Sequence, residues 1–425
     1  MNGAEFQTGE DFALAMDKHD PLREFRDRFH IPRSGKGEEC VYLCGHSLGL
    51  QPKSVAAHVE QELKDWAELG VEGHFRAKHP WMPYHHLLAE QTAALVGAQP
   101  QEVVVMNSLT VNLHLMMVSF YRPNRTRHKI LVERGAFPSD QYAVKSQIRF
   151  HGFDPASSLL ELTPRAGEDC PRQEDIEELI DRSADEIALI LLGGVNYSTG
   201  QAFDMQRITL AGRRHGCMVG LDLAHAAGNL ELKLHDWAPD FAVWCSYKYL
   251  NGGPGCVAGC FVHSRHARSF DLPRFAGWWG HNESTRFEMP PIFQPMSGAD
   301  GWQLSNPPII SLAALRASME IFDQAGMSRL RQKSVSLTNY LEFLLNCNYS
   351  GDYSVITPSH AEQRGAQLSI RIKNNGRSLC ERLLREGIVG DWREPDIFRI
   401  APVPLYNSFL DVFRFVRKFK SAVSA

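Results

Sequence analysis

The sequence predicts an α/β fold, in which a mostly parallel, doubly wound sheet is joined to a smaller α+β domain at the C-terminal end. In the middle third of the chain, short apolar runs alternate with helix-length segments, a pattern typical of βαβ units. Near the C-terminus, a long helical stretch is followed by two more strand-like runs. The chain has 425 residues, which is too long for a single hydrophobic core and fits two domains.

The strands of the large domain are predicted from six apolar runs with β-branched and aromatic residues. These runs are EVVVMNS (102–108), KILVER (129–134), IALILLGGV (187–195), MVGLDLAH (218–225), FAVWCS (241–246) and CVAGCFV (256–262). The helix-length segments between them are the expected crossovers. Parallel strands connected in this way form a sheet that is covered on both faces.

The two ends of the chain have a different organisation. The segment CGHSLGLQPK (44–53) is predicted to be a loop that opens a helix, and Val55, Val59, Leu63 and Trp66 then recur at helical spacing. After the segment 305–326 comes a long helical stretch, and then the runs QLSIRIK (367–373) and IFRIAPVPL (397–405). We therefore divide the chain into a segment 1–60 that joins the small domain, a large domain 61–310 and a small domain 311–425.

Composition excludes several classes of protein. Lys and Arg total 45 against 49 Asp and Glu, so the concentrated basic surface that nucleic-acid binding needs is not expected. The N-terminus has no apolar signal-peptide core, and no stretch reaches the roughly 20 apolar residues of a membrane helix. The nine cysteines are scattered without zinc-site spacing, so we expect a reduced, cytoplasmic protein with no metal site.

Two polar side chains follow neighbouring predicted strands. Asp222 closes the run MVGLD, and a buried carboxylate there needs a partner. A protonated pyridine nitrogen, a ribose or a metal would serve, and the simpler alternative is a helix cap. Lys248 follows the next run between Tyr247 and Tyr249, where a lysine can act as a Schiff-base amine or simply extend to solvent. The combination is the arrangement of fold-type I pyridoxal-phosphate enzymes.

Two further segments lie at strand ends, where ligands bind in open α/β sheets. Ser108, Leu109 and Thr110 fall between a strand and a helix, so free backbone N–H groups there can hold a phosphate or be capped by Ser108. Phe137 follows another strand, and its ring could stack on a flat cofactor or simply belong to the core.

The ordered segments of the whole chain resemble those of the kynureninase family. The matching segments are GHSLGLQPK, NSLTVNLH, FPSDQYA, GVNYSTGQ, GLDLAHAAGN, WCSYKYLNGGPG, GWWGH, STRF, SNPPI and RIAPVPLYNSF. The resemblance implies a pyridoxal 5'-phosphate enzyme of fold type I that is a cytoplasmic homodimer with its active site at the subunit interface. It implies hydrolysis of the Cβ–Cγ bond of L-kynurenine or 3-hydroxy-L-kynurenine to an anthranilate and L-alanine, in tryptophan catabolism and NAD biosynthesis.

The resemblance also assigns roles to residues of this sequence. Lys248 would bind the cofactor covalently and serve as the Cα base, Asp222 would pair with the pyridinium nitrogen, and Tyr247 is the candidate proton shuttle. The other residues implied at the cofactor are Leu109, Thr110, Phe137, Asp140, His225, Trp278 and Asn306, with Trp278 reaching in from the partner subunit. Gly193 departs from relatives that offer a hydroxyl there, so a backbone group or a water would have to substitute.

The substrate would meet a second set of residues. Arg399 would bind the substrate α-carboxylate as a bidentate fork, a geometry that lysine cannot reproduce. Ser47, His74, Ser305 and Asn306 would line the pocket at the aryl end. Since His74, Ser305 and Asn306 are polar, we expect a preference for the 3-hydroxylated substrate. The simpler alternative is that His74 stacks on Trp81 while Asn306 caps a turn.

Two other functions remain open from the sequence. A cysteine desulfurase-like enzyme on the same fold would need a catalytic cysteine on a loop, and Cys347, after the sheet domain, is the candidate. A non-catalytic binding protein on an inherited scaffold is the third possibility. The joint presence of Asp222, Lys248 and Arg399 argues against it, because a scaffold without chemistry has no need of all three.

Overall fold

The computed structural model describes residues 6–347 and 351–423, and its centre is a seven-stranded sheet. The strand order is β2-β8-β7-β6-β5-β3-β4. The bounds are β2 Val103–Met106, β3 Lys129–Glu133, β4 Leu159–Leu162, β5 Ile187–Gly193, β6 Met218–Asp222, β7 Phe241–Trp244 and β8 Ala258–Val262. The strands from β4 to β7 pair in parallel, whereas β8 is antiparallel to both of its neighbours. The predicted mostly parallel sheet is thus confirmed.

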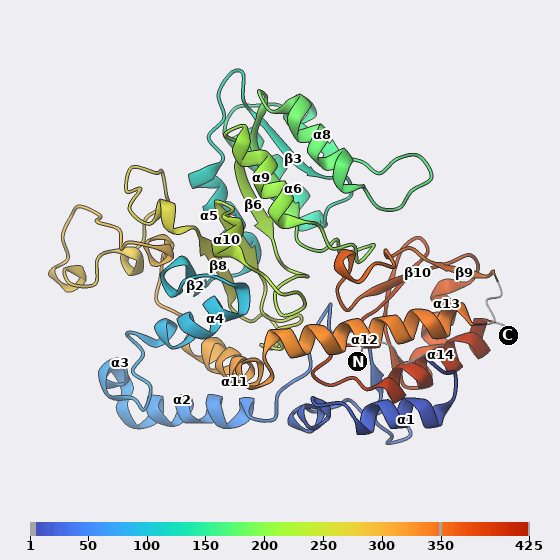
Figure 1. Cartoon of the computed structure of the whole chain (residues 1–425). Coiled ribbons are helices and arrows are strands. Elements are labelled where there is room, and N and C mark those ends of the chain that lie inside the picture. The colour runs from blue at the N-terminus through green and yellow to red at the C-terminus, as the bar shows by residue number, and fades with distance from the viewer. Residues whose placement is uncertain (1–5, 348–350, 424–425) are drawn as a thin grey trace.

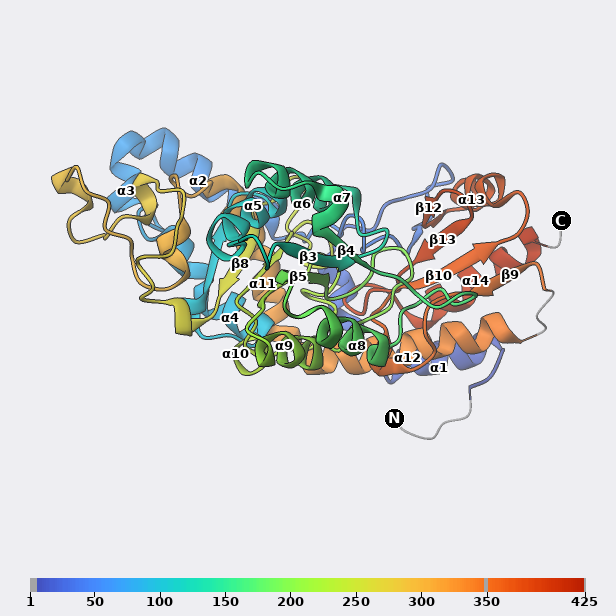
Figure 2. The same cartoon turned by 90° about the horizontal axis from the view of Figure 1, so that it is seen from above.

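Helices cover both faces of this sheet, as a doubly wound fold requires. Figure 2 shows α5, α6 and α7 on one side of β3 and β5, and α8, α9 and α10 on the other. The bounds are α5 Leu109–Phe120, α6 Pro138–Phe150, α7 Pro155–Ser158, α8 Gln173–Ser183, α9 Met205–Arg214 and α10 Leu234–Trp237. Helices α5 and α6 pack apolar side chains on one face and α8 and α9 on the other, and with the strands they form separate cores on the two faces.

The C-terminal domain, drawn in red and orange in Figure 1, is built on an antiparallel sheet of order β12-β13-β10-β9. Its strands are β9 Tyr353–Val355, β10 Leu368–Ile372, β12 Asp391–Arg393 and β13 Ile397–Ile400. The helices are α12 Met327–Asn346, α13 Gly376–Arg385 and α14 Phe409–Val423. The predicted smaller α+β domain is confirmed, with two of its four strands at the predicted runs.

The N-terminal segment packs on this small domain. Helix α1 (Glu10–Lys18) contacts α14, and the carboxylate of Asp17 accepts the backbone N–H groups of Phe409 (2.7 Å) and Leu410 (3.0 Å) at the start of α14. Strand β1 (Val41–Tyr42) pairs in parallel with β11 (Ile388–Val389). An acidic cap at a helix N-terminus is stabilising because it satisfies free donors and complements the helix dipole.

Helix α2 (Val55–Leu69) occupies the predicted position but does not bury all of its apolar positions. It packs on α11 (Ile309–Ala325), while Trp66 is 63% exposed and Leu63 is 47% exposed. The side chain of Glu62 is buried instead, where it accepts hydrogen bonds from Trp81 and Tyr84. Since α11 contributes to the core of the large domain, packing continues past the predicted boundary at residue 310.

The remaining helices, α3 (Gly73–Arg76) and α4 (Ala89–Val96), lie near α2 and β2. No helix among the described residues is long and apolar enough to cross a membrane.

All nine cysteines are free thiols, and most of them are buried in the packed interior.

Candidate active site

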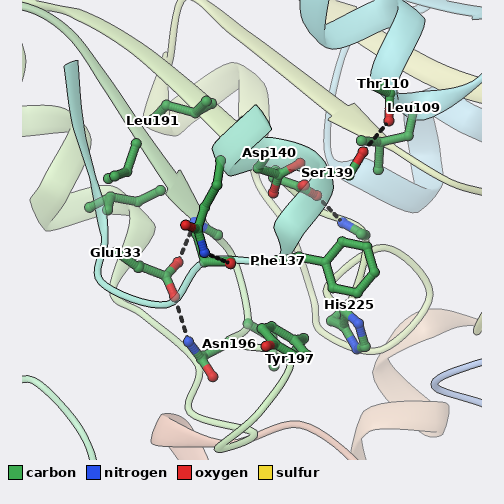
Figure 3. A pocket seen from close by; sticks show the side chains of 18 of the residues that line it. Leu109, Thr110, Glu133, Phe137, Ser139, Asp140, Leu191, Asn196, Tyr197 and His225 are labelled. Carbon is green, nitrogen blue, oxygen red and sulfur yellow. Dashed lines mark hydrogen bonds between the residues drawn. The ribbon is translucent and has the colours of Figure 1, made fainter. Parts of the chain in front are cut away.

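The candidate site lies where the parallel strands β6 and β7 end side by side. Asp222 is the last residue of β6 and pairs with Val243 of β7, and Lys248 follows β7 by four residues. A pocket opens at this edge of the sheet (Figure 3). Eight of the predicted site residues line it, namely Leu109, Thr110, Phe137, Asp140, Asp222, His225, Tyr247 and Lys248.

Two helix N-termini meet at one end of the pocket. Helix α5 begins at Leu109, and α6 begins at Pro138, next to Ser139. The hydroxyl groups of Thr110 and Ser139 are 2.7 Å apart, as Figure 3 shows. Ser108 does not cap α5 with its side chain, so the first N–H groups of that helix keep no side-chain acceptor. Free N–H groups, a pair of hydroxyls and two helix dipoles together suit a phosphate.

Three carboxyl groups, those of Glu133, Asp140 and Asp222, also line the pocket. Burial, together with the charge of Asp222, raises the pKa of Asp140 well above its usual range. Burial also raises the pKa of Glu133, the last residue of β3. Within residues 6–347 and 351–423, none of the three forms an ion pair. A cationic ring nitrogen placed beside them would supply the missing positive charge, so the pocket fits a protonated pyridine ring.

Lys248 points into the same pocket. Its Nζ atom lies 3.0 Å from Nε2 of His225 and 5.8 Å from the centroid of the Phe137 ring. Burial and the nearby Lys248 charge lower the pKa of His225 far below its usual range, so the imidazole is neutral and its Nε2 accepts the hydrogen bond. The amine is therefore held at a defined place beside an aromatic face.

The loop that contains Ser47 fixes the backbone of this lysine. The N–H group of Gly49 donates to the carbonyl of Tyr247 (2.8 Å), and a Cβ atom on Gly49 would lie 2.3 Å from the carbonyl oxygen of Lys248. Only glycine allows so close an approach. Ser47 itself lies in the turn that precedes Gly49, where its N–H group donates to Cys44, and it does not line the pocket.

Arg399 reaches the pocket wall from β13 of the small domain. Its Nη1 group donates to the carbonyl of Tyr197 (2.7 Å), and its Nη2 group is paired with Asp391. Tyr197 lines the pocket, so Arg399 lies behind this residue. The guanidinium is buried, and desolvation lowers the pKa of Arg399 to about 10, which leaves it charged at neutral pH.

Four predicted site residues lie elsewhere in the single chain. Nδ1 of His74 is 3.0 Å from the carbonyl of Val71, and its ring meets Trp81 edge to face. Trp278 is partly exposed and donates to the carbonyl of Arg286. Ser305 and Asn306 line a separate cavity near the end of β2.

Other residues line the pocket although the sequence did not single them out. Among them are Glu133, Ser139, Asn196 and Tyr197. The backbone N–H group of Gly193 donates to Glu133 (2.7 Å), so this amide is already engaged. A charged residue at the end of the apolar run KILVE was the available signal for Glu133, as it was for Asp222.

Some histidine, cysteine and carboxylate groups from distant segments lie close enough to hold a cation, but none of these sets lines the pocket. The sets are Cys44, His46 and Asp391; His85, His86 and Glu283; and Glu102, His235 and His263. Asp391 already pairs with Arg399, and Glu102 already accepts from the backbone of Gln99 and Ser264. The carboxylates of Asp391 and Glu102 thus already have partners within the protein.

Comparison with proteins of known structure identifies the fold. The chain is similar to a mutant of the cystine C–S lyase C-DES, with a TM-score of 0.76 at 15% identity, covering 89% of this chain and 96% of that one. It is also similar to the cysteine desulfurase CsdA from Escherichia coli, with a TM-score of 0.74 at 18% identity, covering 94% and 98%. At such identities the likeness concerns the fold alone.

Comparison of sequences is more specific. The profile of the kynureninase C-terminal domain matches residues 330–419. The chain is 69% identical to the kynureninase of Koribacter versatilis, over 99% of both chains. It is 61% identical to that of Myxococcus xanthus and 55% identical to that of Stenotrophomonas maltophilia, over at least 96% of each chain. The chain therefore belongs to the kynureninase family.

Proposed function

We propose that this protein is a pyridoxal-phosphate-dependent kynureninase. It hydrolyses the Cβ–Cγ bond of L-kynurenine or its 3-hydroxy form and releases an anthranilate and L-alanine, in tryptophan degradation and NAD biosynthesis. One observation carries the proposal: Lys248 and Asp222 face one pocket from neighbouring strand ends in a chain that is 69% identical to a kynureninase. Cys347, the candidate of a desulfurase, ends α12 and is no part of this pocket.

The pocket offers a place for each part of the cofactor. The N–H groups of Leu109 and Thr110, with the hydroxyls of Thr110, Ser139 and Tyr247, would bind the phosphate. Phe137 would cover one face of the ring. Asp222 would hold the ring nitrogen protonated, with Asp140, whose pKa is raised by burial and by the charge of Asp222, beside it. When bound, the cofactor supplies an electron sink for the negative charge that develops on the substrate.

The residues around the cofactor would then move protons. Lys248 would hold the cofactor and, as a free amine, would take the proton from Cα of the substrate. Neutral His225 accepts a hydrogen bond from this amine and so holds it in place. Burial raises the pKa of Tyr247, so its phenol stays protonated near neutral pH and can donate a proton to the alanine carbon after bond cleavage.

Arg399 would bind the substrate carboxylate. A guanidinium has five N–H donors, and the contacts to Tyr197 and Asp391 occupy only two of them. Nε is buried and has no partner among the described residues. A carboxylate that reached Nε–H and a free Nη–H would satisfy this donor and form a bidentate pair.

The enzyme would be a cytoplasmic homodimer. Residues of the partner subunit would complete its active site. Large apolar side chains are exposed on α2 and α3 and in the segment around Trp278, at the end of the molecule opposite the small domain (Figure 1). Exposed apolar side chains gathered in this way are typical of a subunit interface. In the proposed dimer, His74, Trp278, Ser305 and Asn306 of one protomer face the pocket of its partner.

The test is a product assay on the purified protein. With pyridoxal phosphate and L-kynurenine, we expect equal amounts of fluorescent anthranilate and alanine. Lys248→Ala should remain folded and lose turnover, because the covalent link and the Cα base disappear together. Absence of anthranilate in the parent, or more than trace activity in the variant, would contradict the proposal.

A further inference from the structure

Glu133 is a buried carboxylate in the pocket wall to which neither the resemblance nor the proposed mechanism gives a role. It ends β3, and both of its oxygens accept hydrogen bonds. Oε1 accepts from the backbone N–H of Gly193 (2.7 Å), and Oε2 accepts from Nδ2 of Asn196 (2.6 Å), as Figure 3 shows for Asn196. No basic side chain among the described residues pairs with it, so these two donors are what stabilises the charge.

The partners of Glu133 belong to one loop. Oδ1 of Asn196 accepts the backbone N–H groups of Ser198 and Thr199, both at 2.9 Å. These bonds fix the orientation of the Asn196 amide, because its oxygen must face the turn and its nitrogen must face Glu133. The carboxylate thus holds the side chain on which the turn at residues 196–199 is built.

The same loop supports the groups expected at the substrate. The carbonyl of Tyr197 accepts from Nη1 of Arg399 (2.7 Å) and from Nε2 of Gln367 (3.0 Å). The ring of Tyr197 meets the ring of Phe137 edge to face, at 5.3 Å between centroids. A shift of Tyr197 would therefore move a contact of Arg399 and a contact of Phe137 together.

We propose that Glu133 is a positioning residue, which sets the loop from Gly193 to Tyr197 and thereby orients Arg399 for the substrate carboxylate. The inference rests on the proposed function. Gly193 fits this role, since a Cβ atom there would lie only 2.7 Å from Oε1 of Glu133. The carboxylate occupies the space that a side chain at position 193 would need.

The test is a polarity swap within this hydrogen-bonded pair. In Glu133→Gln, the new amide nitrogen must face either the Gly193 N–H or the Asn196 amide nitrogen, so one donor meets another donor. In Asn196→Asp, two carboxylates meet. In the double variant, the introduced glutamine can donate to the introduced carboxylate and accept from Gly193, and the other carboxylate oxygen still accepts from the turn.

We expect Glu133→Gln to raise KM for L-kynurenine about tenfold or more, with a smaller change in kcat, because a hydrogen bond to a charged group is lost. Asn196→Asp should raise KM as well, and the double variant should recover most of the loss. Glu161→Gln is the matched control, since Glu161 is an exposed carboxylate on the neighbouring strand β4 and should leave KM unchanged.

Cofactor absorbance and melting temperature, measured on all four variants, separate positioning from folding. If the parent is active and Glu133→Gln leaves KM unchanged, the inference is overturned while the proposed function stands. The same holds if the KM of the double variant is no lower than that of the poorer single variant. Loss of folding in every variant at this pair would also overturn it, since Glu133 would then serve stability only. A parent without kynurenine turnover would instead overturn the proposed function itself.

Discussion

Replacing Arg399 by lysine should raise KM for kynurenine and leave kcat nearly unchanged. The contacts of the guanidinium determine this expectation. Arginine has five N–H donors, and the bonds to Tyr197 and Asp391 leave three free for a carboxylate. A lysine ammonium has three donors in all, so the same two contacts would leave one. The variant can therefore make at most a single bond where the parent makes a bidentate pair.

The expected loss of substrate affinity follows from the difference of one charge-assisted hydrogen bond. Such a bond contributes about 1.5–3 kcal/mol, which corresponds to roughly 10- to 150-fold in binding. The charge itself is kept, because a lysine ammonium is also cationic at neutral pH. The effect should fall on KM, since the carboxylate is bound equally before and during reaction.

Steady-state kinetics with L-kynurenine would measure this change. Arg393→Lys is the control, because Arg393 pairs with the same Asp391 but is 40% exposed. It should change KM by less than about threefold, as expected for an exposed ion pair. Equal kinetics for Arg399→Lys and the parent would remove Arg399 from the substrate site.

Three further perturbations test the cofactor and substrate sites. Asp222→Ala should weaken cofactor binding about tenfold or more, because a charge-assisted bond to the ring nitrogen is lost; an unchanged Kd by absorbance titration would refute this. Asp140 has a folded-state pKa raised above 3.8, so its contribution to stability is fully present below the unfolded pKa and is lost as pH rises through the folded pKa. The melting temperature of the cofactor-free parent should therefore fall relative to Asp140→Asn as pH rises above the ordinary aspartate pKa, and a constant difference would contradict the assignment. We also expect kcat/KM to be higher for 3-hydroxykynurenine than for kynurenine, and Asn306→Leu to narrow the difference; a parent that prefers kynurenine would rule out this basis of selectivity.

The fold was largely predictable because its central strands are fully buried. A strand such as β5 has no polar face, so its sequence is a continuous apolar run that stands out from its surroundings. The missed strands are short or lie at edges. Strand β4 has the sequence LLEL and an exposed Glu161, and β11 has only two residues. Neither carries enough periodicity to be recognised.

The site was predictable only in part, and for a physical reason. Asp222 and Lys248 end neighbouring parallel strands, so topology alone brings them to the same edge of the sheet. The function of Glu133 depends on Asn196, which lies 63 residues away in the sequence. The pairing of Thr110 with Ser139 likewise joins two helices that no local pattern connects. Residues whose function depends on a distant partner become visible only when the chain is folded.

The packing of the N-terminal segment on α14 determines the order in which the domains can form. Asp17 caps a helix that begins 392 residues later, and Ala13 and Val41 share a core with residues from α14. A ribosome that releases the chain from its N-terminus has exposed the whole seven-stranded sheet before α14 exists. The core shared by α1, β1 and α14 can thus be completed only after α14 has been synthesised. Removal of α14 should leave α1 without its partner, although 392 residues separate Asp17 from Phe409 in the sequence.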